Sequence, residues 1–379
     1  MTPRERMLIA YRHGQPDAVP VSPEIWDATA IAVSGRPFHE LVGPFAQAPW
    51  WQTHLAAFEY FGADAWILAA PGETEGQRAM RTSVSRFLDE ATIETHTTYR
   101  TPHGELRAVS HTTPAYADWL VNHPVKRWPI DMDAYADFFF TDPATADLAE
   151  IDHVIDGVGE KGLVTPLLGD LFTSFLGTVR EGGMAQTIFD LIDEPEYCAR
   201  LNARYTGHLS AQARRILERT KAQALFIHGG YAGLPMINRE IFRQWDAPVL
   251  AAVSAVCREF HTPLHLHQHG YVIPIMDDLI VAGVSLVCPL LPPPQGDVHD
   301  LASVKQRFGR RLALKGNVDP SAVLLHGRVA DVERAVERCI RDAAAGGGFI
   351  LGTADSTIVG TPFENIRAFV EAGRKYGGY

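Results

Sequence analysis

The chain has 379 residues, of which 46% are hydrophobic and 21% are charged, and its formal net charge is −11. An acidic chain without a dense Lys/Arg surface is poorly suited to the phosphate backbone, so we expect no nucleic-acid partner. The four cysteines form no CxxC pair, and no run is apolar enough to span a bilayer. We therefore expect no membrane association and a reduced, cytoplasmic setting.

Short apolar runs alternate with helical patterns along most of the chain. Strands are predicted at Val19–Glu24, Asp64–Ala70, Leu163–Asp170, Ala224–Tyr231, Pro263–Gly270, Ser285–Leu290, Leu312–Val318 and Gly348–Asp355. Helices are predicted at Trp51–Phe61, Arg239–Phe260, Val272–Ala282, Asp297–Arg307, Ala330–Ala345 and Pro362–Tyr376. Eight such units close a parallel sheet into a (β/α)8 barrel, the TIM-barrel architecture, and we expect residues 1–379 to form one such domain.

A long insert, at about residues 71–160, separates the second predicted strand from the third. Within it, Thr82–Thr112 alternates polar and apolar residues around a short turn sequence. This pattern predicts an antiparallel hairpin with its turn at His103-Gly104.

The predicted fifth strand carries three alternating histidines, His265, His267 and His269. Side chains alternate across a strand, so the three share one face, and the two nearest its carboxyl end can converge on one ion. Imidazole suits zinc and other transition metals, so we predict that His267 and His269 bind a metal. His265 lies deeper and is expected to hold another ligand in place. The alternative is that all three form hydrogen-bonded polar layers inside the barrel.

A third ligand must come from another strand. Asp355, at the end of the last predicted strand, is the first choice, mostly because of the family resemblance given below, and Cys288 on the sixth is the alternative. His228, at the end of the fourth strand, is a further candidate, although a hydrogen-bonding role in the pocket suits it better. Tyr231 and Glu24 also lie at strand ends, where either could transfer a proton.

Several motifs resemble the uroporphyrinogen decarboxylase-like superfamily, and they are closest to its branch of cobalamin-dependent methyltransferases. The similar segments are Thr2–Met7, Pro16–Val21, His267-Gln268-His269-Gly270, Gly316-Asn317-Val318-Asp319, Gly346–Leu351 and Thr361–Ile366. The resemblance covers essentially the whole chain outside the insert. It implies a (β/α)8 barrel, in agreement with the independent strand count.

In the zinc-dependent methyltransferases of this branch, a His-x-Cys motif and a later Cys hold the metal. The resemblance places the two cysteine positions at His269 and Asp355 of this chain. Two imidazoles and one carboxylate form a harder site than one imidazole and two thiolates. Zinc is expected first, with manganese, iron, cobalt and nickel as alternatives. The arginine-rich motif of the true decarboxylases does not follow Val21, so porphyrinogen decarboxylation is not expected.

The leading functional hypothesis is a metal-dependent methyltransferase or demethylase acting on a small molecule. The resemblance implies a corrinoid, carried by a corrinoid protein, or tetrahydrofolate as the second substrate. One alternative is a metal-dependent decarboxylase or lyase that acts on a small carboxylic acid. Another is a non-catalytic protein that binds a corrinoid or small ligand in the barrel. A homodimer is the default expectation for the assembly.

Overall fold

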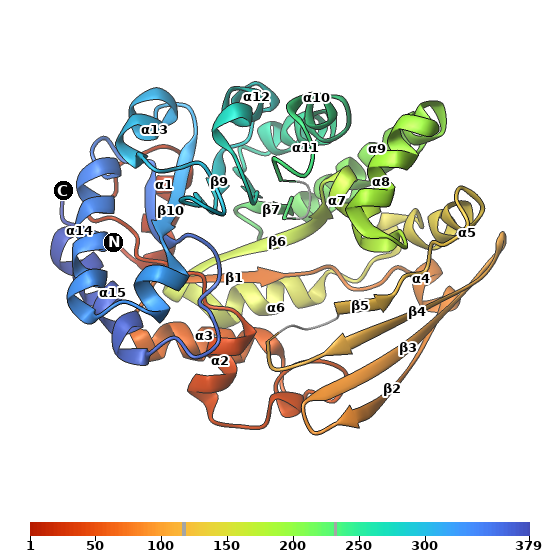
Figure 1. Ribbon diagram of the computed structural model, residues 1–379, viewed down its shortest axis with the longest axis horizontal. Coiled ribbons are helices and arrows are strands. Elements are labelled where there is room, and N and C mark those ends of the chain that lie inside the picture. The colour runs from red at the N-terminus through yellow and green to blue at the C-terminus, as the bar shows by residue number, and fades with distance from the viewer. Residues whose placement is uncertain (116–118, 231–232) are drawn as a thin grey trace.

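A computed structural model describes residues 1–115, 119–230 and 233–379 (Figure 1). These residues form a parallel sheet in the order β1-β6-β7-β8-β9-β10-β11 and an antiparallel sheet in the order β2-β3-β4-β5. The parallel strands are β1 (Ala65–Ala69), β6 (Gly162–Asp170), β7 (Leu225–His228), β8 (Leu264–His267), β9 (Leu286–Cys288), β10 (Ala313–Val318) and β11 (Phe349–Thr353). The antiparallel strands are β2 (Arg81–Asp89), β3 (Thr92–Thr101), β4 (Gly104–Thr112) and β5 (Trp119–Asn122).

Helices flank the parallel sheet and follow its strands in turn (Figure 1). They are α1 (Pro3–Tyr11), α2 (Asp27–Ser34), α3 (Trp50–Phe61), α4 (Glu75–Met80), α5 (Ile130–Phe139), α6 (Ala149–Val158), α7 (Phe172–Val179), α8 (Gly183–Asp193), α9 (Pro195–Arg219), α10 (Arg239–Ile241), α11 (Ala247–Glu259), α12 (Met276–Ala282), α13 (Leu301–Phe308), α14 (Val329–Ala343) and α15 (Phe363–Tyr376). Across the described ranges, none of these helices combines the length and apolar character that crossing a membrane requires.

The helices after the later strands form where their apolar spacing predicts them. In α14, for example, Val332, Val336, Cys339 and Ala343 are buried at intervals of three and four residues, which places them on one face. The same face covers β10 and β11. The alternation of strand and helix thus confirms the predicted parallel α/β fold from β6 to α15.

The predicted first strand, Val19–Glu24, is not a regular strand. It makes isolated parallel bridges to the chain at β11, between Val21 and Leu351 and between Glu24 and Ser356. The two prolines in this segment have no N–H to donate to a ladder, which explains why regular pairing fails there. The parallel sheet therefore has seven regular strands where eight were expected, and an irregular segment lies next to its last strand.

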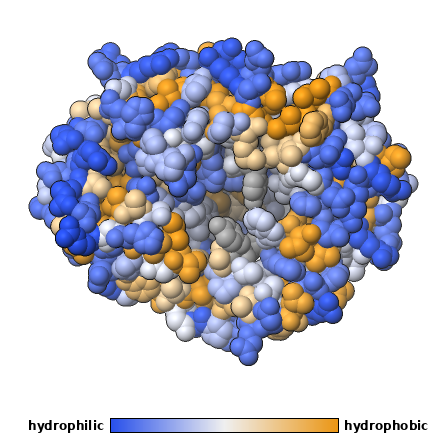
Figure 2. All heavy atoms as spheres, viewed as in Figure 1, coloured by the Kyte–Doolittle hydropathy of each residue, from blue (hydrophilic) through white to orange (hydrophobic). Residues whose placement is uncertain are grey.

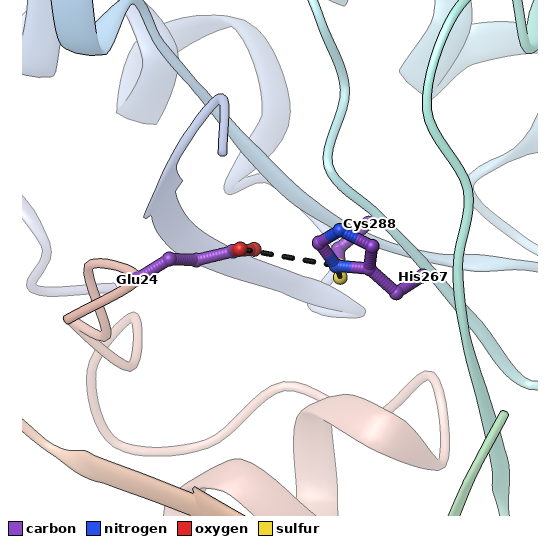
Figure 3. Close-up of side chains that lie close together, drawn as sticks. All are labelled: Glu24, His267 and Cys288. Atoms are coloured by element: carbon purple, nitrogen blue, oxygen red, sulfur yellow. Dashed lines mark hydrogen bonds and ion pairs between the residues drawn. The ribbon is translucent and has the colours of Figure 1, made fainter. Parts of the chain in front are cut away.

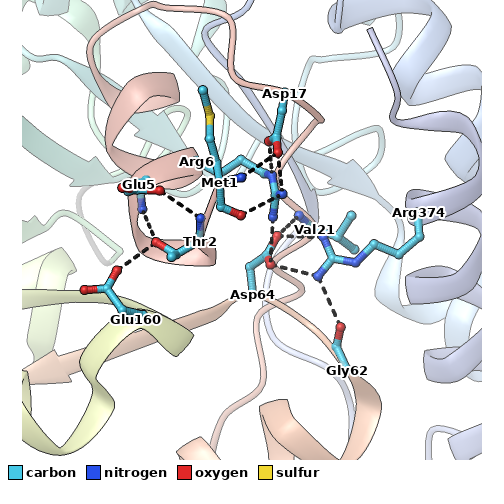
Figure 4. Close-up of polar contacts among 10 residues, drawn as sticks. All are labelled: Met1, Thr2, Glu5, Arg6, Asp17, Val21, Gly62, Asp64, Glu160 and Arg374. Carbon is cyan, nitrogen blue, oxygen red and sulfur yellow. Dashed lines mark hydrogen bonds and ion pairs between the residues drawn. The ribbon is translucent and has the colours of Figure 1, made fainter.

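Hydrogen bonds around Asp64 hold the same segment beside β1 on its other side (Figure 4). The backbone N–H of Asp64 donates to the carbonyl of Val21, and its carboxylate accepts from the N–H of Val21 at 2.7 Å. Arg374 of α15 donates to the same carboxylate at 2.7 Å, and Arg6 of α1 lies 3.7 Å from it. The buried carboxylate thereby joins the N-terminal segment to β1 and to the C-terminal helix.

The insert between β1 and β6 contains more than the predicted hairpin. Strands β3 and β4 pair around a turn at Pro102-His103, with Thr101 opposite Gly104, so the turn lies one residue earlier than predicted. Strands β2 and β5 extend this hairpin on its two sides into a four-stranded sheet. Figure 1 shows this sheet to one side of the parallel sheet, with α4 and α5 next to it.

Candidate functional site

The carboxyl ends of the parallel strands bring together most of the polar residues named from the sequence. His228, His267 and Cys288 are the last residues of β7, β8 and β9, which pair as neighbours. Asp355 follows β11 and has a positive φ of 96°, which is unusual for a residue other than glycine. His269 lies beyond the observed end of β8, so the predicted strand to Gly270 was too long. A loop conformation, and not strand alternation, therefore positions its ring.

His267, His269 and Asp355 form what we call the outer cluster. The Nε2 atoms of His267 and His269 are 2.7 Å apart, and Nε2 of His269 is 3.3 Å from Oδ2 of Asp355. One nitrogen or oxygen atom from each residue lies within 4.8 Å of the others. Two imidazoles and a carboxylate at this spacing could hold a divalent transition metal, with His267 and His269 offering the same ring nitrogen.

Glu24, His267 and Cys288 form an inner cluster on the other side of the His267 ring (Figure 3). All three side chains are buried. Nδ1 of His267 lies 3.2 Å from Sγ of Cys288 and 3.8 Å from Oε2 of Glu24. Figure 3 shows the Glu24 carboxylate pointing across the gap toward the ring and the sulfur. Oε2 of Glu24 has no hydrogen-bond partner among the described residues. His267 thus presents one nitrogen to each cluster.

Lys315 of β10 supplies a cation next to the inner cluster, and sequence reasoning did not identify it. Its Nζ donates to Oε1 of Glu24 at 2.7 Å, and both side chains are fully buried. The same ammonium lies 4.3 Å from the centre of the Trp66 ring. A lysine inside a mostly apolar strand was the available signal, because such a residue is rarely buried without a partner.

A chain of hydrogen bonds connects His267 through Cys288 and His265 to Tyr11. His265 lies 2.8 Å from the hydroxyl of Tyr11 through Nδ1 and 2.9 Å from Sγ of Cys288 through Nε2. Burial, followed by the charge of Glu24, raises the pKa of Cys288 well above its ordinary value, so the sulfur keeps its proton. If that proton points to His265, then Nδ1–H of His267 donates to the sulfur. This arrangement leaves a lone pair on Nε2 of His267, as a metal ligand requires.

The three residues of the outer cluster differ in charge. Burial, together with the nearby rings of His269 and His228, holds the pKa of His267 well below its ordinary value, so His267 is neutral. Burial also opposes charge on His269, but its contact with Asp355 outweighs burial and raises its pKa. The pKa of Asp355 is lowered despite burial, because His269 stabilises its charge. Without a metal, His269 and Asp355 therefore behave as an ion pair.

His228 forms a separate pair with Asp170, the last residue of β6. Nδ1 of His228 lies 2.7 Å from Oδ1 of Asp170. The ring of His228 stacks on that of His267, with 5.3 Å between the ring centres. His228 thus lies hydrogen-bonded beside His267, and its role in the pocket stays a prediction. Tyr231, the other predicted proton carrier from this strand end, lies outside the described residues.

A cavity of about 770 Å³ lies over these strand ends. Its wall includes the three outer-cluster residues, His228 and Asp170, together with apolar side chains such as Trp26 and Phe226. Figure 2 shows that one face of the molecule is hollowed near its centre. Cys288 and Glu24 do not line the cavity, because they lie beneath His267. The outer cluster is therefore accessible to a small molecule, and the inner cluster is closed.

Comparisons with known proteins concern the family and the fold of the chain. The chain is 34% identical over 157 residues to uroporphyrinogen decarboxylase from Microcystis aeruginosa, with 41% of each chain covered. It is 26% identical over 151 residues to a methylated-thiol–coenzyme M methyltransferase from Methanosarcina mazei, covering 40% of this chain and 37% of that one. The chain thus spans about two-fifths of the length of these curated relatives.

Over its whole length the fold is similar to that of a solved methyltransferase from Methanosarcina mazei. The TM-score is 0.69 at 18% identity, and 99% of each chain is covered. The family model for uroporphyrinogen decarboxylase (URO-D) matches residues 162–376, more than half of the chain. The chain therefore belongs to the uroporphyrinogen decarboxylase (URO-D) family, which confirms the resemblance found in its sequence motifs.

Proposed function

We propose that this chain is a metal-dependent methyltransferase or demethylase whose ion is held by Nε2 of His267, Nε2 of His269 and a carboxylate oxygen of Asp355. The observation that carries this proposal is the convergence of these three atoms on the wall of a cavity. Zinc is the first choice of ion, because it accepts nitrogen and oxygen ligands and leaves a position open in catalytic sites. The methyltransferases among the relatives support the choice of methyl transfer.

The buried lysine favours the outer cluster over the inner one. Lys315 already places a positive charge 2.7 Å from Glu24, in a region that water does not reach. Adding a divalent ion between Glu24 and Cys288 would bring two cations together where charges are weakly screened. The raised pKa of Cys288 also opposes formation of the thiolate that a metal binds. We therefore assign the inner cluster a positioning role behind His267.

The bound ion would act as a Lewis acid, either lowering the pKa of a nucleophile or polarising the oxygen of a methyl donor. Side chains of the protein would accept and donate the protons. An ionised Asp170 carboxylate has no proton to donate, so Nδ1–H of His228 donates to it, and Nε2 of His228 can accept a proton from a substrate hydroxyl or thiol. Donation from Nδ1–H of His267 to Sγ of Cys288, at 3.2 Å, keeps that ring oriented, and Oε2 of Glu24 lies 3.8 Å from the same nitrogen.

The second substrate is proposed to be a corrinoid, presented by a corrinoid protein, or tetrahydrofolate. The cavity of about 770 Å³ suits a small molecule placed at the outer cluster. The macrocycle of the corrinoid, or the pterin of tetrahydrofolate, would then have to approach the opening of the cavity. We also propose that the protein works in the cytoplasm, in line with its scattered, buried cysteines.

A metal-dependent decarboxylase or lyase is the second candidate, because other relatives are uroporphyrinogen decarboxylases. In that case the carboxylate of a small acid would bind at the outer cluster, and the ion would stabilise the developing carbanion. Porphyrinogen itself suits the cavity poorly, since its several carboxylates would face a wall without lysine or arginine among the described residues.

The first test is elemental analysis of protein purified without chelator. We expect about one equivalent of a transition metal in the native chain and a loss of most of it in His267→Ala and Asp355→Ala, because three protein ligands define the site. The exposed His96 provides a matched control, and His96→Ala should keep the metal. A native chain that stays metal-free after incubation with zinc would contradict the metal site.

The reaction is tested with the metal-loaded protein. Methyl exchange with methylcobalamin or methyltetrahydrofolate, lost in His267→Ala and kept in His96→Ala, is the result expected for methyl transfer. Metal-dependent carbon dioxide release from a small acid, without methyl exchange, would instead support the second candidate.

A further inference from the structure

Strand β2 of the antiparallel sheet has an uncovered edge. The sheet order is β2-β3-β4-β5, so β2 pairs with β3 on one side, and no other strand in the described part of the chain pairs with its outer side. Figure 1 shows β2 as the outermost strand of this sheet, on the side away from the parallel sheet. Eight of its nine residues are exposed. The N–H and C=O groups on its outer side therefore meet solvent.

The composition of β2 does little to protect this edge. Proteins usually block long edge strands with lysine, proline or a covering helix, because an open edge can pair with strands of other chains. β2 contains neither lysine nor proline, and its two arginines each lie against a glutamate of the same copy. It exposes three large apolar side chains, Val84 at 67%, Phe87 at 49% and Leu88 at 51%. A bulge at Leu88 affects only the end of the strand.

The sequence of β2 is self-complementary when two copies run antiparallel. Residues opposite each other in an antiparallel pair both point outward or both point inward, so a two-fold axis must pass through one residue. With the axis at Ser85, Arg81 of each copy approaches Asp89 of the other, and Val84 lies opposite Arg86. An axis at Arg86 would bring two arginines together, and an axis at Val84 would leave Asp89 beyond the end of the other strand. Opposite charges stabilise a cross-strand pair and like charges destabilise it, which favours the axis at Ser85.

We propose that β2 pairs antiparallel with β2 of a second copy of this chain, so that two four-stranded sheets form one continuous sheet in a homodimer. A strand of nine residues is about 30 Å long, and its main-chain hydrogen bonds would provide much of the contact. The exposed side chains of Val84, Phe87 and Leu88 would add apolar contacts. Such an interface is small, so the dimer is expected to dissociate on dilution. The inference is independent of the proposed function, because it uses no residue of the metal site.

This interface leaves the cavity open. Trp119, which lines the cavity, belongs to β5 at the other edge of the antiparallel sheet. A second copy at β2 would thus be separated from the cavity by the full width of that sheet. Each copy of the dimer therefore keeps its own accessible outer cluster.

Analytical ultracentrifugation of the purified full chain over a range of concentrations tests the dimer, and two variants of Val84 test its register. Val84→Lys places a lysine opposite Arg86 of the second copy, so the dissociation constant should rise at least about tenfold. Val84→Glu removes the same apolar side chain but places a carboxylate opposite that arginine, so the dimer should be kept. Val281→Lys, at a position of α12 that is 87% exposed, is the matched control and should dimerise like the native chain.

Hydrogen exchange locates the interface. The outward-pointing amides of β2 should exchange slowly in the native dimer and faster in Val84→Lys, because pairing protects them. A native chain that is monomeric at every concentration would overturn the second copy as the partner of β2. A dimer that Val84→Lys leaves intact, or that lysine and glutamate weaken equally, would overturn the proposed pairing.

Discussion

Replacing Lys315 with methionine would leave the Glu24 carboxylate charged and buried without its counter-ion. Both side chains are fully buried, and Nζ and Oε1 are 2.7 Å apart. At an effective dielectric constant of about 20, two charges at this distance attract by about 6 kcal/mol. Desolvation of both groups cancels part of that attraction, and removal of one partner from a buried pair costs about 3–5 kcal/mol. Loss of the contact with Trp66 would add about 1 kcal/mol.

Urea unfolding of metal-free protein provides the assay. We expect Lys315→Met and Glu24→Gln each to lower the free energy of unfolding by about 3–5 kcal/mol. The double variant should lose much less than the sum of the two, because it leaves no unpaired charge. Lys375→Met, which breaks an exposed pair with Glu333, is the matched control and should leave the free energy of unfolding almost unchanged.

A Lys315→Met variant within about 1 kcal/mol of the native chain would refute this reasoning, since it would mean that Glu24 takes up a proton or water at little cost. Additive losses in the double variant would also refute it. The expected pattern would show that Lys315 compensates the buried charge of Glu24 next to the proposed metal site.

The remaining predictions concern the outer cluster and its surroundings. Without metal, contact with Asp355 raises the pKa of His269, and contact with His269 lowers the pKa of Asp355. The pair therefore stabilises the fold at a pH where Asp355 is ionised and His269 is still protonated, and this contribution is lost as the pH rises through the folded pKa of His269. The deficit of Asp355→Asn in urea unfolding should therefore be largest near pH 5 and shrink as the pH rises through the folded pKa of His269; a constant deficit would contradict the pair. The Cys288 thiol should resist alkylation by iodoacetamide in the native chain at about pH 8, because it is buried and its pKa is raised. Mass spectrometry follows the reaction, and rapid alkylation would show that the residues covering Cys288 move aside. Gly230→Ala would place a Cβ 2.6 Å from Nε2 of His228, so it should displace that ring and lower methyl exchange about tenfold or more while one equivalent of metal is kept; unchanged exchange would remove His228 from the proposed proton transfer.

Local patterns were sufficient to predict most of the parallel fold. From β6 onward, apolar runs and helical spacing placed strands and helices close to their observed positions, because each element buries one face and its period appears in the sequence. Errors arose where the pattern was interrupted. The prolines in Val19–Glu24 prevent a regular strand, and the hairpin around His103 is part of a larger sheet whose exposed strands have a weak pattern.

The spacing of His267 and His269 and the place of Asp355 at a strand end were readable from the chain, because the carboxyl ends of parallel strands meet at one edge. The tertiary structure alone decided which nitrogen of His267 faces each cluster and that His269 lies on a loop. It also decided that Lys315 pairs with Glu24, a residue 291 positions away. Sequence periodicity reports which face a residue occupies, whereas contacts between distant segments depend on how the sheet curls and which side chains remain unpaired inside it.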